Sequence, residues 1–141
     1  MEEKHWYEVK ASYKVLTGEN PTEHAEVLLV GAVTFAEAEE LAANEVATEA
    51  DRFDIEVKAC AIRKYGNIIR MVDAEQVDTA FYKCRVLVAT DDLRMKPEAS
   101  LIEAVDFSAA TDRIADFYSR ACCDFEIDSV QKTQIKNVIG Q

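Results

Sequence analysis

Apolar and polar side chains alternate along residues 6–15. This period-two pattern is typical of a β-strand with one buried face. Turn residues follow at Gly18 to Pro21, and a second strand is predicted over about 26–33. We predict that the buried face of the first strand consists of Tyr7, Val9, Ala11, Tyr13 and Val15.

A helical pattern follows the second strand. Thr34 is predicted to cap this helix, because Glu37 stands three residues later and completes a capping box. The helix is expected to end near Ala50. Its predicted apolar stripe consists of Ala38, Leu41, Ala42 and Val46. A third strand is predicted after it, with apolar residues at Phe53, Ile55, Val57, Ala59 and Ala61.

The chain contains two copies of this pattern. Leu29–Phe35 is matched by Leu101–Phe107, and Phe53–Glu56 by Phe125–Asp128, both at an offset of 72 residues. Matches with offsets of 75 and 70 join Trp6-Tyr7 to Phe81-Tyr82 and Asn67–Ile69 to Asn137–Ile139. A period of this length is too long for a solenoid repeat. We therefore predict an internal duplication, with a first repeat over 5–70 and a second over 80–139.

The second copy shows the same elements. Asp106 is predicted to cap its helix, and its strands are expected at about 81–90, 100–105 and 124–135. The short acidic stretch 73–78 is interpreted as a linker within one domain. The predicted core face of the helix consists of Phe107, Ala110, Ile114, Phe117 and Ala121.

These patterns predict a single α+β domain over residues 1–141. A strand-strand-helix-strand unit occurs twice, so six strands are expected in mainly antiparallel arrangement, with two helices on one side and a pseudo-twofold axis between the copies. The strands form either one continuous sheet or two stacked sheets, and the sequence leaves both open.

Composition narrows the class of protein. With 49% apolar and 30% charged residues the chain is not disordered, and 16 basic against 27 acidic residues give a net charge of −11. Such a charge repels free polyanions at long range, although a local basic patch can still bind them. No apolar run suits a membrane span and no secretory signal is visible, so we expect a cytoplasmic protein without a membrane partner. The cysteines are expected to be reduced thiols at Cys60, Cys84, Cys122 and Cys123.

Signatures of catalysis are missing from the sequence. The four glycines are not clustered into a phosphate-binding loop, and the two histidines, His5 and His24, do not combine with cysteines at metal-ligand spacing. Acidic pairs such as Asp91-Asp92 are interpreted as solvated surface. We therefore expect neither an enzyme nor a bound metal or cofactor.

The strand face turned away from the helices is the candidate binding surface. Strand parity places Trp6 and Phe81 there, together with several cations. The predicted binding residues are Trp6, Lys10, Lys58, Phe81, Lys83, Arg85 and Lys132.

Three interpretations of this face remain open. The first is a solvated sheet with cross-strand ion pairs such as Lys10 with Glu56. The second is a protein interface, with a partner or in a homodimer, in which aromatic residues form the centre and charges the rim. The third is a ligand platform, on which Trp6 and Phe81 stack nucleic-acid bases while basic side chains bind phosphates.

The strand motifs resemble an uncharacterised family of small proteins from Bacteroidetes, their phages and mobile elements. The resemblance covers about residues 5–139 and rests on Trp6–Lys10, Phe53–Ala59 and Asp124–Val130. It implies no catalytic residues. Combined with the charge pattern, it favours a non-enzymatic interaction module of a phage or mobile element. The alternatives are an accessory protein that binds single-stranded nucleic acid or nucleotides, and an acidic inhibitor of a host defence enzyme.

Overall fold

The computed structural model describes residues 3–71, 78–92, 94–121 and 124–140. The cysteine pair at 122–123 and most of the predicted linker therefore lie outside the described residues. The chain forms β1 (His5–Thr17), β2 (Asn20–Ala32), α1 (Phe35–Val46), β3 (Arg52–Arg63), β4 (Asn67–Ile69), β5 (Ala80–Ala89), β6 (Met95–Ala104), α2 (Phe107–Ser119), β7 (Phe125–Lys132) and β8 (Ile135–Ile139).

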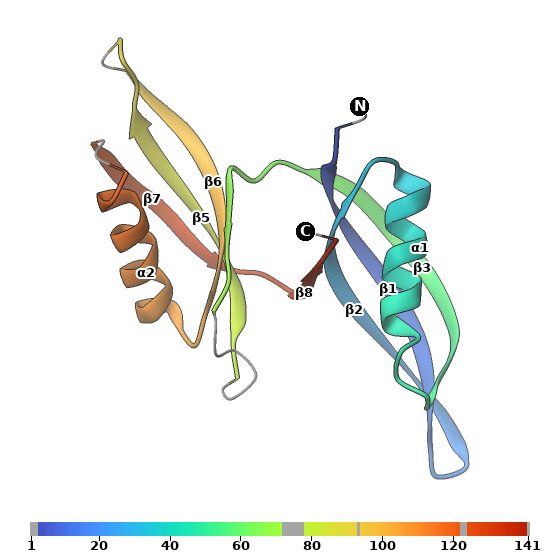
Figure 1. The fold of residues 1–141 in the computed structure, drawn as a ribbon. Helices are drawn as coiled ribbons and strands as arrows, with labels where there is room; N and C mark the ends of the chain where they lie inside the picture. The colour runs from blue at the N-terminus through green and yellow to red at the C-terminus, as the bar shows by residue number, and fades with distance from the viewer. Residues whose placement is uncertain (1–2, 72–77, 93, 122–123, 141) are drawn as a thin grey trace. The chain divides into compact units, whose positions relative to one another are not determined.

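The chain divides into two compact units, each with one helix and a four-stranded sheet (Figure 1). The first unit comprises residues 1–64 and 135–141, with strand order β3-β1-β2-β8. The second comprises residues 65–134, with strand order β4-β6-β5-β7. The predicted α+β class and the repeated strand-strand-helix-strand unit are confirmed. The expected number of six strands is wrong, because each repeat ends in a further short strand.

These two short strands are exchanged between the repeats. β4 follows β3 in the chain but pairs in parallel with β6, whereas β8 follows β7 and pairs in parallel with β2. Each sheet therefore contains three strands of one repeat and the last strand of the other. Periodicity does not reveal the exchange, because a strand of three to five residues carries no information about its partner.

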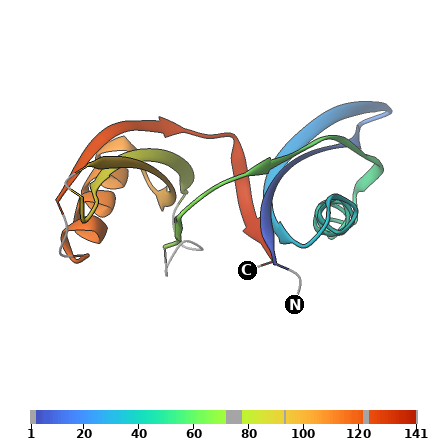
Figure 2. The ribbon, with the colours of Figure 1, turned by 90° about the horizontal axis from the view of Figure 1, so that it is seen from above.

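The core of the first unit lies between its sheet and α1. Figure 2 looks along this helix and shows it inside the curve of the sheet. Four of the five residues predicted for the buried face of β1 are fully in this core, and Val15 packs against it. Ala38, Ala42 and Val46 are the buried residues of α1. The small alanines let the helix approach the sheet closely, and each large aliphatic side chain buried there contributes about 1.5–3 kcal/mol.

Both helices begin as predicted. The Thr34 hydroxyl accepts a hydrogen bond from the Glu37 amide at 3.1 Å, and the Asp106 carboxylate accepts one from the Ala109 amide at 2.8 Å. Each bond satisfies one of the free N–H groups at a helix N-terminus. Neither α1, of 12 residues, nor α2, of 13 residues, is long and apolar enough to cross a membrane; this finding covers the described part of the chain.

The duplication extends to the aromatic contacts of the cores. Tyr7 meets Phe35 edge-on with ring centroids 4.8 Å apart, and Tyr82 meets Phe107 in the same way at 4.9 Å. The interplanar angles are 66° and 65°. The two units thus repeat the same edge-to-face pair at the start of each helix, an arrangement that aromatic quadrupoles favour.

The predicted core face of the second helix needs correction. The buried residues of α2 are Ala110, Ile114 and Tyr118, whereas Phe107 and Phe117 are exposed and Ala121 lies beyond the helix. Tyr118 takes the inner position predicted for Phe117. Its hydroxyl has hydrogen-bond partners on β6, so the ring can be buried without leaving a polar group unsatisfied.

The third strands align differently from the sequence match. Tyr13 of β1 lies between the pairs Ser12–Glu56 and Lys14–Phe53, so both Asp54 and Ile55 stand opposite it in a β-bulge. Asp54 has the positive φ of 51°. Beyond the bulge the offset between the two strands is 70, because Ala11 pairs with Val57 where Val86 pairs with Ile127. The core residue Phe125 therefore corresponds to Ile55, and Phe53 is exposed.

A second bulge changes which residues at the end of β3 face the core. Lys10 pairs with Ala59 and Ala11 with Val57, so Lys58 is an extra residue in the strand. Beyond it Cys60 packs against the core, and Ala59, predicted to be buried, is exposed. Arg85 and Val86 of β5 flank an equivalent register shift against β7.

Candidate functional site

The predicted strand parity is confirmed in both repeats. Tyr82, Cys84 and Val86 of β5 belong to the core of the second unit, as their counterparts in β1 belong to the core of the first. The alternate positions of β1 and β5 therefore lie on the sheet face opposite the helix. We call this the outer face of each sheet.

The two aromatic residues predicted for the outer face are not exposed there. Phe81 is only 2% exposed, and the Arg70 guanidinium lies 5.8 Å from the centre of its ring. Trp6 is half-buried and stands opposite Gly31, whose missing side chain leaves room for the indole. The expectation of an exposed stacking residue at Phe81 is wrong.

The predicted cations are distributed over different environments. Arg85 binds Asp128 across the strands at 2.9 Å, and Lys58 binds Glu56 at 3.0 Å. Lys10 and Lys83 are exposed. Arg85 and Lys10 hold matching positions in the two repeats, so the cross-strand pair expected at Lys10 is formed by its counterpart. In the first repeat Glu56 instead forms its ion pair with Lys58, the extra residue at the bulge of the same strand.

Lys132 does not belong to the outer face. It pairs with Tyr82, and directly opposite residues of an antiparallel pair point to the same side of the sheet. Because Tyr82 is a core residue, Lys132 lies on the helix side, exposed at the end of β7. The bulge at Arg85/Val86 causes this change of side, which simple alternation does not anticipate.

The outer face of the first sheet contains a groove of about 490 Å³ where β1, β2 and β3 lie together. Its two lysines are held in ion pairs, Lys14 with Asp54 at 3.5 Å and Lys58 with Glu56 at 3.0 Å. The Glu56 carboxylate raises the pKa of Lys58 by hydrogen bonding and charge. We call this the charged groove; it is lined by Ser12, Lys14, Glu23, Asp54, Ile55, Glu56 and Lys58.

Phe53 provides the exposed aromatic side chain that was expected elsewhere. It pairs with Lys14, which lies on the outer face, and it is 38% exposed at one end of the charged groove. Periodicity assigned Phe53 to the core because the bulge at Asp54 and Ile55 is not visible in the alternation. The local signal that sequence reasoning missed is Asp54, a residue type that tolerates the positive φ found in the bulge.

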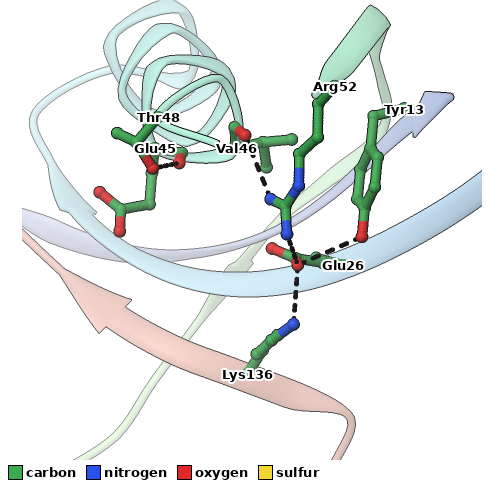
Figure 3. A network of polar contacts seen from close by, with 7 residues as sticks. All are labelled: Tyr13, Glu26, Glu45, Val46, Thr48, Arg52 and Lys136. Atoms are coloured by element: carbon green, nitrogen blue, oxygen red, sulfur yellow. Dashed lines mark hydrogen bonds and ion pairs between the residues drawn. The ribbon is translucent and has the colours of Figure 1, made fainter. Parts of the chain in front are cut away.

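A second polar cluster lies on the helix side of the first sheet (Figure 3). The Glu26 carboxylate accepts hydrogen bonds from Arg52 at 2.9 Å and Lys136 at 2.8 Å, and lies 3.5 Å from the Tyr13 hydroxyl. Arg52 also donates to the Val46 carbonyl at the end of α1 and covers the Tyr13 ring. Lys136 belongs to β8, so this carboxylate joins the exchanged strand to β2 and β3.

The two cations determine the ionisation of Glu26. Its side chain is only 9% exposed, and burial by itself disfavours the charged form. The hydrogen bonds and charges of Lys136 and Arg52 together outweigh this effect, so the pKa of Glu26 is lowered. A small pocket of about 230 Å³ adjoins the carboxylate, and three of its lining residues, Glu26, Arg52 and Lys136, are joined to one another in this network.

The second unit has a carboxylate in the equivalent place. Glu98, at an offset of 72 from Glu26, accepts hydrogen bonds from Asn67 at 2.6 Å and from the Tyr118 hydroxyl at 2.8 Å. Asn67 belongs to β4, and Ser100 completes the cluster 2.9 Å from the Tyr118 hydroxyl. Burial is the main cause of the raised pKa of Tyr118. Both exchanged strands are thus bound to the same carboxylate position of the repeat.

The described cysteines do not form a reactive pair. Cys60 and Cys84 are free thiols, and burial raises the pKa of Cys84 to about 11. Within the described ranges no group of three or more His, Cys, Asp or Glu side chains is placed to hold a metal ion.

Comparison with known proteins identifies a family. The family model for a domain of unknown function, DUF4494, matches residues 5–141. No curated protein and no solved structure matches the chain.

Proposed function

The chain belongs to the DUF4494 family of domains of unknown function, and from this premise we propose that it is a non-enzymatic module that binds a protein partner through the charged groove. The proposal depends mainly on one observation. Phe53 is an exposed aromatic side chain next to a groove rimmed by lysine and carboxylate side chains. An aromatic residue surrounded by a polar rim is typical of the energetic centre of a protein interface.

The charge of the groove indicates the chemistry of the partner. Both lysines are neutralised by Asp54 and Glu56, and among the described residues Glu23 has no salt bridge. The net charge of −11 adds to this negative potential. A protein segment with basic side chains therefore complements the groove, and its association is accelerated at low salt.

The nucleic-acid alternative has weaker support. A stacking platform needs exposed rings and free cations, whereas Phe81 is buried and Arg85 and Lys58 bind carboxylates. A basic partner surface is characteristic of proteins that themselves bind nucleic acid. The proposed setting is a phage or mobile element in a bacterial cytoplasm, and an acidic inhibitor of a host defence enzyme is a special case of the same proposal.

The test compares two exposed phenylalanines. The tagged chain is incubated with host lysate, and the retained proteins are quantified for the wild type, for Phe53→Asp and for Phe117→Asp. Phe117 is the matched control, since it is 36% exposed and lies on α2. We expect a specific partner to be reduced by at least about tenfold with Phe53→Asp and to remain with Phe117→Asp.

Two further measurements separate the alternatives. Retention of the same proteins by Phe53→Asp contradicts the proposal. Binding of a single-stranded oligonucleotide at low salt that is lost with Lys10→Glu and Lys83→Glu would favour the nucleic-acid alternative. Light scattering is expected to give the mass of one chain, 15.8 kDa, and a dimer would point to self-association instead.

A further inference from the structure

The last strand of each repeat pairs with the sheet of the other repeat, along the side of β2 or β6 that its own repeat leaves unpaired. We call this side of β2 or β6 the acceptor edge. The registers show how far each last strand would have to travel to reach the acceptor edge of its own repeat. In the second sheet β7 ends at Lys132, which pairs with Tyr82, and Tyr82 pairs with Ile102. The acceptor edge lies on the far side of β6, where Asn67 pairs with Ser100. A strand coming from β7 has to cross β5 and β6 to reach this edge.

The connection after β7 is too short for that path. Three strand spacings amount to about 14 Å. Ile135 pairs with Val27 in the first sheet, and the counterpart of Val27 in β6 is Ala99, which lies three residues, or about 10 Å, along the strand from Ile102. The direct distance is therefore about 17 Å. From Lys132 to Ile135 the chain spans at most about 11 Å when fully extended. Thr133 further binds the Phe81 carbonyl through its amide at 2.9 Å and its hydroxyl at 2.8 Å, which holds the connection beside β5.

The first repeat has the same geometry. Arg63 at the end of β3 is level with Trp6 and Gly31, whereas the acceptor edge of β2 begins near Leu28. Four residues from Arg63 to Asn67 span about 14 Å at most, against about 17 Å to the edge. Moreover, β3 runs parallel to β2, and a parallel connection within one sheet needs a dozen or more residues.

We propose that the outer edges of β2 and β6 are strand-binding sites that only the other repeat can fill. The ligand is a short extended segment that pairs in parallel and reaches the repeated carboxylate. At β2 it is Ile135–Ile139 with Lys136 on Glu26, and at β6 it is Asn67–Ile69 with the Asn67 amide on Glu98. Two polypeptides that each carry one repeat are therefore obligate partners, bound through reciprocal strand exchange.

The sites differ in how they receive the end of the strand. Gly31 and Gly140 approach so closely that a Cβ atom on Gly31 would lie 2.5 Å from the Gly140 carbonyl oxygen. At the corresponding place in β6, Glu103 is buried and accepts hydrogen bonds from the Met71 amide at 2.9 Å and the Thr79 hydroxyl at 2.8 Å. Each edge therefore selects its own strand, which favours the correct pairing of the two repeats.

The experiment cuts the folded chain between Met71 and Asp78. A protease recognition sequence replaces residues 73–77 of the full-length chain, and the cut protein is passed over a sizing column at micromolar concentration. We expect both fragments to elute together at the mass of the uncut chain and to separate only in denaturant. Separation of the fragments without denaturant overturns the proposal.

Two lysine variants show whether the exchanged strands hold the fragments together. Lys136→Glu places a negative charge beside Glu26, whereas Lys132→Glu makes the same change at an exposed position of β7 outside the exchanged strand. We expect the dissociation constant of the cut complex to rise at least about tenfold for Lys136→Glu and to change less than about twofold for Lys132→Glu. Equal effects of the two variants contradict the proposal.

A variant in the other exchanged strand provides an independent check. Asn67→Asp places a carboxylate against Glu98, and we expect it to weaken the cut complex in the same way. Circular dichroism of each uncut variant verifies that it folds. If Lys136→Glu does not fold even when uncut, the result for Asn67→Asp decides.

Discussion

Single side chains perform two distinct tasks in this molecule. Glu26 and Glu98 are structural anchors, because each binds the incoming strand and a residue of its own repeat. Phe53 and the ion-paired lysines of the charged groove contact solvent and are available to a partner. The difference is one of side: the anchors lie on the helix side of the sheet and the groove on the outer face.

At this scale we predict a pH-dependent contribution of Glu26. Its pKa is lowered in the folded state, so its contribution to stability is present above the unfolded value of 4.5 and is lost as pH falls through the folded value. Glu26→Gln is expected to reduce the free energy of unfolding by about 1–3 kcal/mol at pH 7, and by progressively less in acid. Urea unfolding at pH 7 and below pH 4 measures this difference.

The control for Glu26 is an exposed pair of the same type. Asp116 binds Arg120 at 3.2 Å on the surface of α2, with both side chains largely exposed. Asp116→Asn is expected to change stability by less than about 1 kcal/mol. A loss for Glu26→Gln no larger than that, or one independent of pH, would show that Glu26 is not an anchor.

At the scale of the elements, the docking of β8 depends on two glycines. Gly140 has a φ of 76° and a Cβ atom there would lie 2.4 Å from the Gly31 carbonyl oxygen. Gly18 has a similar φ of 68° in the β1–β2 turn, with nothing within 4 Å of the added atom. A comparison of Gly18 with Gly140 therefore separates the free-energy cost of backbone strain from that of close packing.

We predict that Gly18→Ala costs about 1–2 kcal/mol, the strain of a left-handed backbone, and that Gly140→Ala costs more. The excess reflects the collision with β2 and is measured as the difference in the free energy of unfolding. Equal losses for the two variants would mean that the end of β8 is free to move away from Gly31.

The elements also show where periodicity is informative. Both helix starts, the inner faces of β1 and β5 and the duplication were predicted, since these features depend on neighbouring residues. The errors at Phe53 and Lys132 both result from bulges. One extra residue in a strand means that the alternation on one side of the bulge no longer predicts the sheet face on the other side. Strands β4 and β8 were missed as elements because they are short and their partners are distant in the chain.

At the scale of the whole molecule, strand exchange is expected to couple the stability of the two units. Trp6, the single tryptophan, lies in the first unit and Ile114 in the core of the second. Ile114→Ala removes about 2–5 kcal/mol from the second core. If β4 and β8 join the units into one cooperative structure, the unfolding midpoint reported by Trp6 fluorescence shifts as well.

A first-unit variant is the reciprocal control. Val46→Ala in the core of α1 is expected to shift the Trp6 signal whether or not the units are coupled. Unchanged Trp6 fluorescence in Ile114→Ala, together with a shift in Val46→Ala, would show that the units unfold independently. The far-UV circular dichroism of Ile114→Ala would then show two transitions.

The sequence by itself determined the repeat, its order of strands and helix, the helix caps and the side of β1 and β5 that is buried. These features follow from local chemistry and from periodicity within one element. Tertiary structure decided which repeat receives each final strand, where Phe53 and Lys132 point and which carboxylate binds the incoming strand. Those outcomes depend on bulges, connection lengths and contacts between residues as far apart as Glu26 and Lys136, which no local pattern encodes.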